Sequence, residues 1–255
     1  MYFFNVNTVS LRFFSSFHMP NEKIKLSRRT LLVAGAAAVP LMSIPMRRSQ
    51  AEGLEGVVLH QYKPVFFSPA EWTFIMAACD RLIPAEGRGP GALETNVPVF
   101  IDQQLHGDLG KDIYMQGPHP AEFAATLGFQ NPHSPQEMYR VGIKLAQQYS
   151  QQTHGKPFEQ LADADKDALL TGLQKNGVDF AALGEPTLKA SQFFGQFLSD
   201  TKNGYLADPM YGGNKDMKAW VAIGFPGARG AFTEWVDQHD RKYPLGPVSL
   251  SGKRA

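Results

Sequence analysis

The stretch that most restricts the fold is residues 203–227, which read NGYLADPMYGGNKDMKAWVAIGFPG. This Gly/aromatic segment has too many glycines and prolines for a regular helix and too many large aromatic side chains for a flexible linker. Glycines allow positive φ angles and close approach of the backbone, and buried aromatic rings offset the entropy that is lost when glycines are fixed. The segment is therefore expected to be an ordered loop that presses against other parts of the protein.

Two segments begin with Ser-Pro-x-Glu, which predicts the start of a helix. Ser68 and Ser134 are the expected N-caps, each followed by a first-turn proline and a capping-box glutamate. Apolar residues at helical spacing follow, up to Pro84 in the first case and to about Gln152 in the second. Further helices are predicted over 96–106, from Asp163, from Glu185 to a C-cap at Asn203-Gly204, and from Ala231 to Asp240.

The remaining patterns favour a mainly α protein. No segment alternates four or more apolar residues with β-branched enrichment, and no fixed-period repeat is visible. Residues 52–67 are expected to be an extended arm, and the proline-containing dipeptides between Gly107 and Pro135 predict a long irregular excursion. The predicted fold is one compact helical domain over 52–255, with long ordered loops rich in glycine, proline and aromatic residues.

The first 51 residues look like an export signal of the twin-arginine type. An Arg-Arg pair is followed by two leucines, then by an apolar run that ends at Ile44 and by a small-x-small pattern. The residues that carry this prediction are Arg28, Arg29, Leu31, Leu32 and Ala51. A membrane anchor is the alternative, but the run is short and rich in alanine and glycine for a membrane span. Met19 opens a more usual leader, so it is a second candidate for the true start.

Such a leader predicts that the protein acts in the periplasm. The twin-arginine translocase would be its first partner, and that route carries folded proteins, often together with a cofactor-bearing partner. A chain that uses it is a candidate subunit of a redox enzyme, associated with the inner membrane through its partners.

Charge and cysteine content exclude several classes of function. The formal net charge is +1, but seven of the 25 basic residues and one of the 24 acidic residues lie in the first 51, which leaves a mildly acidic body. No basic stripe interleaved with aromatic residues remains, so nucleic-acid binding is not expected. Cys79 is the single cysteine, which excludes an intrachain disulfide and a C-x-x-C-H haem site. It is expected to be a small buried residue, with an intersubunit disulfide as the alternative.

No catalytic, cofactor-binding or metal-ligating residue is predicted for this chain. The six histidines after the leader form no metal-binding spacing, and the hydrolase, dinucleotide and nucleotide motifs are missing from the sequence. Asp102, Asp208 and Asp216 could act as acids or bases in a cleft, but single carboxylates at turns usually cap or close the turn.

Several motifs together resemble the gluconate 2-dehydrogenase small (gamma) subunit family. They are the helix-forming stretch 66–84, the Pro90-Gly-Ala loop before 97–102, and the pair D-P-x-Y-G-G-N at 208–214 and I-G-F-P-G at 223–227. The resemblance covers nearly all of the chain after the leader. It implies an accessory subunit of a periplasmic, membrane-associated FAD-dependent dehydrogenase, needed for export, stability and assembly of the flavoprotein.

The resemblance also implies which partners carry the cofactors. FAD is expected in a large dehydrogenase subunit of the glucose-methanol-choline type, and haem c in a multihaem cytochrome c that passes electrons to membrane quinone. No cofactor is expected in this chain. Two rival readings remain: a freestanding periplasmic enzyme with a tertiary His/Asp site, and a periplasmic sugar-binding module.

The role of the Gly/aromatic segment has two readings. Its aromatic side chains could fill the protein's own core, or part of the segment could form the interface with the flavoprotein, where rigid Tyr and Trp anchors give contact area at low entropic cost. The candidate interface residues are Tyr205, Asp208, Tyr211, Asn214, Trp220 and Phe225.

Overall fold

The described part of the chain is built from α-helices. The computed structural model describes residues 53–87, 89–111, 131–241 and 243–255. The predicted leader residues Arg28, Arg29, Leu31, Leu32 and Ala51 lie outside this part. Its helices are α2 (Pro69–Leu82), α3 (Val97–His106), α4 (Pro135–His154), α5 (Asp163–Gln174), α6 (Ala190–Leu206) and α7 (Lys218–Ile223). Within the described ranges there are isolated β-bridges but no sheet, so the predicted mainly α fold is confirmed.

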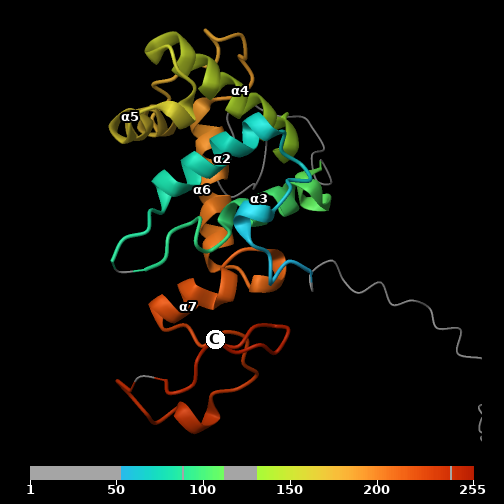
Figure 1. The fold of residues 1–255 in the computed structure, drawn as a ribbon, viewed down its shortest axis with the longest axis vertical. Helices are drawn as coiled ribbons and strands as arrows, with labels where there is room; N and C mark the ends of the chain where they lie inside the picture. Colours follow the sequence, from blue (N-terminus) through green and yellow to red (C-terminus); the bar gives the residue numbers. More distant parts are fainter. Residues whose placement is uncertain (1–52, 88, 112–130, 242) are drawn as a thin grey trace, which may run out of the picture. The chain divides into compact units, whose positions relative to one another are not determined.

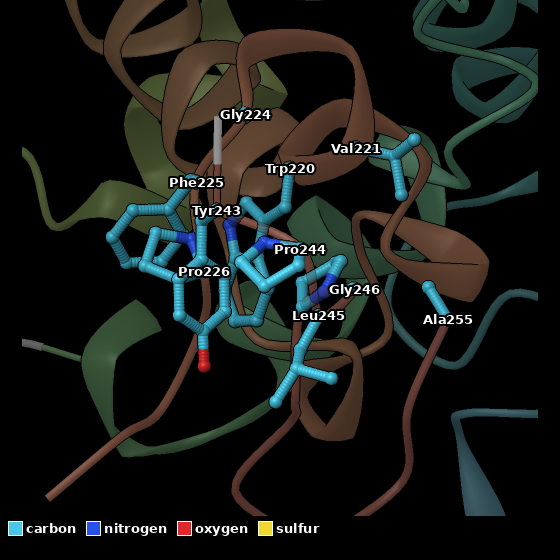
Figure 2. Close-up of a pocket in the computed structure, with 11 residues that line it drawn as sticks. Trp220, Val221, Gly224, Phe225, Pro226, Tyr243, Pro244, Leu245, Gly246 and Ala255 are labelled. Atoms are coloured by element: carbon cyan, nitrogen blue, oxygen red, sulfur yellow. The ribbon is translucent and has the colours of Figure 1, made fainter. Parts of the chain in front are cut away.

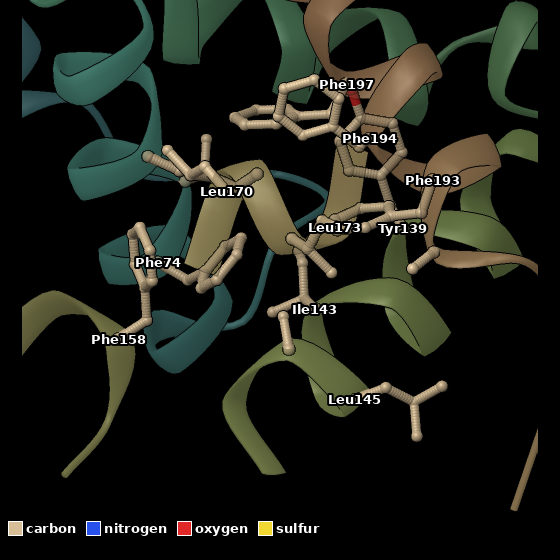
Figure 3. Close-up of a cluster of buried hydrophobic side chains, with 14 of the residues drawn as sticks. Phe74, Tyr139, Ile143, Leu145, Phe158, Leu170, Leu173, Phe193, Phe194 and Phe197 are labelled. Atoms are coloured by element: carbon tan, nitrogen blue, oxygen red, sulfur yellow. The ribbon is translucent and has the colours of Figure 1, made fainter. Parts of the chain in front are cut away.

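Helix α6 is the element around which the others are packed. It contacts α2, α3, α4, α5 and α7, and Figure 1 shows it in orange among the other helices. Its buried face carries Phe193, Phe194 and Phe197, three of the rings that Figure 3 shows in the core. An apolar face of this size stabilises a helix through tertiary packing more than helix propensity does.

Aromatic rings make the centre of the core. The ring of Tyr139 on α4 meets Phe193 and Phe197 edge to face, with centroids 5.9 and 6.2 Å apart. Its hydroxyl donates to Asp200 Oδ2 at 2.8 Å, so the buried hydroxyl is satisfied. Burial, and then the neighbouring Asp200 carboxylate, raise the pKa of Tyr139 well above its usual value. This tyrosine is therefore a neutral structural residue.

The two Ser-Pro-x-Glu signals begin helices as predicted. Ser68 accepts a hydrogen bond from the Glu71 amide and Ser134 from the Glu137 amide, and both capping boxes are complete. The helices predicted from Asp163 and over 96–106 are also found, as α5 and α3.

The predicted limits of the fourth helix are wrong at both ends. It begins at Ala190, because Glu185 accepts hydrogen bonds from the amide and hydroxyl of Thr187 and holds a turn there. It ends at Leu206, because Gly204 lies inside the helix, where a Cβ would approach the ring of Phe100 to 2.8 Å. Gly204 is thus a packing glycine and not a C-cap.

Two other predictions need correction. The predicted helix from Ala231 to Asp240 is reduced to one 3-10 turn, Thr233–Trp235, where Phe232 and Trp235 pack against Tyr243. The Gly/aromatic segment is not a loop throughout, since its first residues belong to α6 and α7 lies within it. Most of the excursion predicted between Gly107 and Pro135 lies outside the described residues.

The predicted extended arm is anchored by one buried carboxylate. Asp102 on α3 is fully buried and accepts hydrogen bonds from the backbone amides of Val65, Phe66 and Phe67 at 2.8 to 3.0 Å. It also accepts from the Tyr62 hydroxyl at 2.6 Å. Burial and this carboxylate raise the pKa of Tyr62. Asp102 is therefore a structural acceptor, which explains it without catalysis.

Replacing the Asp102 carboxylate should destabilise the whole domain. Asp102→Asn removes one of the two acceptor oxygens and the charge from four hydrogen bonds, so we expect a loss of about 3 kcal/mol in the free energy of unfolding, measured in urea. Asp80→Asn, at an exposed position on α2, is the control and should have no effect. An unchanged unfolding midpoint for Asp102→Asn would contradict the structural role of this carboxylate.

Two glycines should respond to alanine with opposite signs. A Cβ on Gly142 of α4 would lie 2.3 Å from the ring of Phe193, whereas one on Gly195 of α6 would meet nothing within 4 Å. We expect Gly142→Ala to cost about 1–3 kcal/mol through overpacking, and Gly195→Ala to add about 1 kcal/mol through helix propensity. Thermal unfolding of both variants measures the difference; equal melting temperatures would contradict the close packing of α4 on α6.

Candidate functional site

The Gly/aromatic segment folds back against the end of α6. After Leu206, Asp208 caps the 3-10 turn Pro209–Tyr211 by accepting from the Met210 amide at 3.1 Å. Gly212 has a φ of +92°, and a Cβ on Gly213 would lie 2.1 Å from the carbonyl oxygen of Gly204. Two stretches of backbone therefore touch without an intervening side chain, which only glycine permits.

Asn214 holds the middle of the segment in place. It is fully buried in the left-handed region, donates to the Ala207 carbonyl and accepts from the Ala219 amide, both at 2.9 Å. Asp216 and Met217 are also left-handed, with φ of 55° and 54°. Non-glycine residues in this region cost about 1–3 kcal/mol each, so the surrounding contacts determine this backbone.

Trp220 is the internal aromatic anchor of the segment. It is nearly fully buried, and its indole nitrogen donates to the Leu206 carbonyl at 2.8 Å. The ring of Phe225 lies edge-on to it, with centroids 5.1 Å apart. Tyr205 is partly buried and donates to the Pro90 carbonyl at 2.9 Å.

The structure divides the six candidate interface residues into two groups. Asp208, Asn214 and Trp220 are buried and Tyr205 is partly buried, whereas Tyr211 and Phe225 are exposed. The structure also exposes two apolar residues that were not predicted for an interface, Val221 and Ile223 on α7. Sequence reasoning missed them because it looked for large aromatic anchors.

The chain beyond the segment forms a C-terminal arm, residues 228–241 and 243–255, which is tied back at three points. The Val248 amide donates to the Pro226 carbonyl at 3.2 Å, and the Leu250 amide donates to Asp208 Oδ2 at 2.7 Å. Lys253 bonds the buried carboxylate of Glu55 at 2.5 Å. Asp208 therefore joins the segment to the arm.

The ion pair at Glu55 connects the two ends of the described chain. Burial raises the pKa of Glu55, but hydrogen bonds from Lys253 and Ser251 more than compensate, so the net effect is a lowered pKa. A carboxyl with a lowered pKa contributes stability above its usual pKa and loses it as the pH falls through the lowered value. The contact is thus formed at neutral pH.

An apolar hollow lies between α7 and the C-terminal arm. It has a volume of about 310 Å³ and is shown in Figure 2 with its lining residues. Trp220, Val221 and Phe225 supply one side, and Tyr243, Pro244, Leu245 and Pro247 the other. The lining is mostly apolar, so the hollow suits an apolar side chain better than a charged substrate.

Two of the candidate acids, Asp102 and Asp208, and the single cysteine serve the fold in the described part of the chain. No group of three or more His, Cys, Asp or Glu side chains there could hold a metal ion. Cys79 is fully buried in the core, and burial raises the pKa of its thiol, so the cysteine lies where a buried residue was expected. Asp102 and Asp208 are occupied by structural hydrogen bonds. No helix of the described ranges is long and apolar enough to cross a bilayer.

Comparison with known proteins identifies the family. The family model of gluconate 2-dehydrogenase subunit 3 matches residues 69–227, from the start of α2 to the end of the Gly/aromatic segment. The chain belongs to the gluconate 2-dehydrogenase subunit 3 family. No curated protein and no solved structure matches it significantly.

Membership of this family confirms the resemblance noted in the sequence. A gluconate 2-dehydrogenase subunit 3 is an accessory subunit of a multi-subunit enzyme, so part of its surface has to meet another subunit. The matched region ends with Gly227, which has a φ of +78° and lies where a Cβ would approach the Val248 carbonyl oxygen to 2.2 Å. The C-terminal arm therefore begins directly after the last residue of the matched region.

Asp208 should control how tightly the C-terminal arm is held. An asparagine has one acceptor oxygen, so Asp208→Asn can satisfy the Met210 amide or the Leu250 amide but not both. We expect one of these amides to exchange roughly tenfold faster, measured by native-state hydrogen exchange. The exposed Asp237→Asn is the control; unchanged exchange at both amides would show that Asp208 does not hold the arm.

Proposed function

We propose that this protein is the accessory small subunit of a periplasmic, membrane-associated FAD-dependent dehydrogenase that oxidises gluconate or a related sugar acid. Its role is the export, stabilisation and assembly of the flavoprotein subunit. The observation that carries the proposal is the match of residues 69–227 to gluconate 2-dehydrogenase subunit 3.

The proposal assigns the redox chemistry to partner subunits. FAD and the substrate-oxidising groups belong to the large subunit, and haem c to a multihaem cytochrome that passes electrons to membrane quinone. The described part of this chain supports that division, because its buried Asp102 and Asp208 and its partly buried Asp200 each accept hydrogen bonds from their own fold. Groups engaged in this way are poor general acids or bases, since a proton transfer would break the contacts that hold the fold.

The export role is supported by the leader. Arg28 and Arg29, followed by Leu31, Leu32 and an apolar run, resemble a twin-arginine signal, and that route carries proteins already folded. A flavoprotein that has bound its FAD in the cytoplasm must cross in folded form. One signal on the small subunit is then sufficient for both chains if they associate before export, which places the assembly step in the cytoplasm.

Export should depend on the arginine pair of this chain. In the host, Arg28→Lys with Arg29→Lys should abolish FAD-dependent gluconate oxidation in the periplasmic and membrane fractions and leave the flavoprotein in the cytoplasm or degraded. Activity assays and immunoblots of the fractions measure the effect. A conservative Lys23→Arg, with Lys25→Arg, in the same leader is the matched control and should export normally.

The outcomes separate this role from its rivals. Wild-type periplasmic activity in a strain that lacks this chain would overturn the proposal. Turnover of a sugar acid by the purified chain alone would indicate a freestanding enzyme instead. Carbohydrate affinity of the isolated chain, with flavoprotein export unaffected by its deletion, would indicate a sugar-binding module.

A further inference from the structure

Exposed apolar side chains are concentrated in one part of the chain. Nine of the ten large exposed apolar residues among the described positions lie between Leu206 and Leu250, and the tenth is Val65. Single exposed apolar residues are ordinary on a protein surface, whereas a grouped set marks an interaction site. The grouping therefore points to the part of the molecule that carries α7 and the C-terminal arm.

Three of these residues line the apolar hollow, and a fourth, Ile223, is the last residue of α7. We call this set the α7 face: Val221, Ile223, Phe225 and Leu245. Val221 and Ile223 are 56% and 60% exposed on α7, and Leu245 is 48% exposed on the arm. Figure 2 shows Val221 and Leu245 at the periphery of the hollow. A face with apolar side chains around an apolar hollow has the composition of the centre of a protein interface.

The walls of the hollow are fixed before any partner arrives. Trp220 is held by its hydrogen bond to the Leu206 carbonyl, and Asn214 fixes the start of α7 through the Ala219 amide. Pro226, Pro244 and Pro247 line the hollow and have restricted φ angles. A preorganised pocket loses little conformational entropy on binding, and a pocket of this kind is where an interface concentrates its binding energy.

We propose that the α7 face is the docking surface for the flavoprotein subunit, with an apolar side chain of that subunit seated in the hollow. This inference rests on the proposed function. The choice of a partner subunit as the occupant follows from two observations. Members of the family are subunits of a multi-subunit enzyme, and Val221, Ile223 and Phe225 lie inside the region that matches the family. A hollow of about 310 Å³ is at the small end of binding pockets, which suits one large side chain.

The proposal changes the roles of the candidate interface residues. Asp208 and Asn214 are buried and position the α7 face, Trp220 is buried but lines the hollow, and Phe225 belongs to the face itself. Substitution of Asp208 or Asn214 would weaken docking only by disturbing the fold. Substitution of exposed α7-face residues should weaken docking and leave the fold intact, so the two kinds of residue are experimentally separable.

The test uses a charge placed on the face. This chain is co-expressed with the tagged flavoprotein subunit as wild type or as Val221→Glu, Ile223→Glu or Leu245→Glu. Because a carboxylate buried against an apolar partner is strongly disfavoured, we expect each variant to reduce recovery of this chain with the flavoprotein at least tenfold. Val65→Glu is the matched control, since Val65 is 50% exposed and belongs neither to α7 nor to the C-terminal arm, and should be recovered like the wild type.

Each outcome decides a different point. If the wild type and all three variants are recovered equally, the docking surface is wrong while the proposed function stands. If the wild type is not recovered with the flavoprotein, the proposed function fails and the docking proposal with it. If the isolated chain dimerises in light scattering, and Val221→Glu abolishes the dimer but not flavoprotein binding, the face is occupied by a second copy. Unchanged circular dichroism and melting temperatures establish that the variants are folded.

Discussion

The contact between Gly213 and Gly204 is the constraint on which the candidate site depends. A Cβ on Gly213 would lie 2.1 Å from the Gly204 carbonyl oxygen, and a Cβ on Gly204 would lie 2.8 Å from the ring of Phe100. The turn therefore sits directly on the backbone of α6, and α6 sits directly on α3. From that position Asn214 reaches the backbone on both sides of the turn, and Trp220 reaches the Leu206 carbonyl.

The backbone of this turn is strained, and nearby contacts offset the cost of that strain. Asn214, Asp216 and Met217 all have positive φ angles, which disfavour the segment by itself. Two hydrogen bonds of a buried amide and the burial of an indole ring oppose that cost. A backbone that is strained locally and held by tertiary contacts has one conformation, so α7 is presented as a rigid element. Rigid presentation is what a docking surface requires.

The features that the sequence predicts correctly are those set by contacts between residues close together in the chain. Ser68 and Ser134 begin helices because capping is a contact between residues three apart. The role of Gly204 could not be predicted, because a glycine in a helix and a glycine at its end differ only in what packs against them, here Phe100. The exposure of Val221 and Ile223 likewise depends on which other parts of the fold pack against them. Their apolar character favours burial, and only the position of α7 against the rest of the chain leaves them uncovered.

The distribution of polar and apolar groups explains why this protein fits the role of a subunit. Buried carboxylates such as Asp102 and Asp208 accept hydrogen bonds from backbone amides, so their role is to hold the backbone in place. Most of the large exposed apolar side chains among the described residues lie between Leu206 and Leu250, where another protein can cover them. Trp220 and the close-packed glycines of the segment thus act from inside, and Val221, Ile223 and Phe225 beside them make the contact.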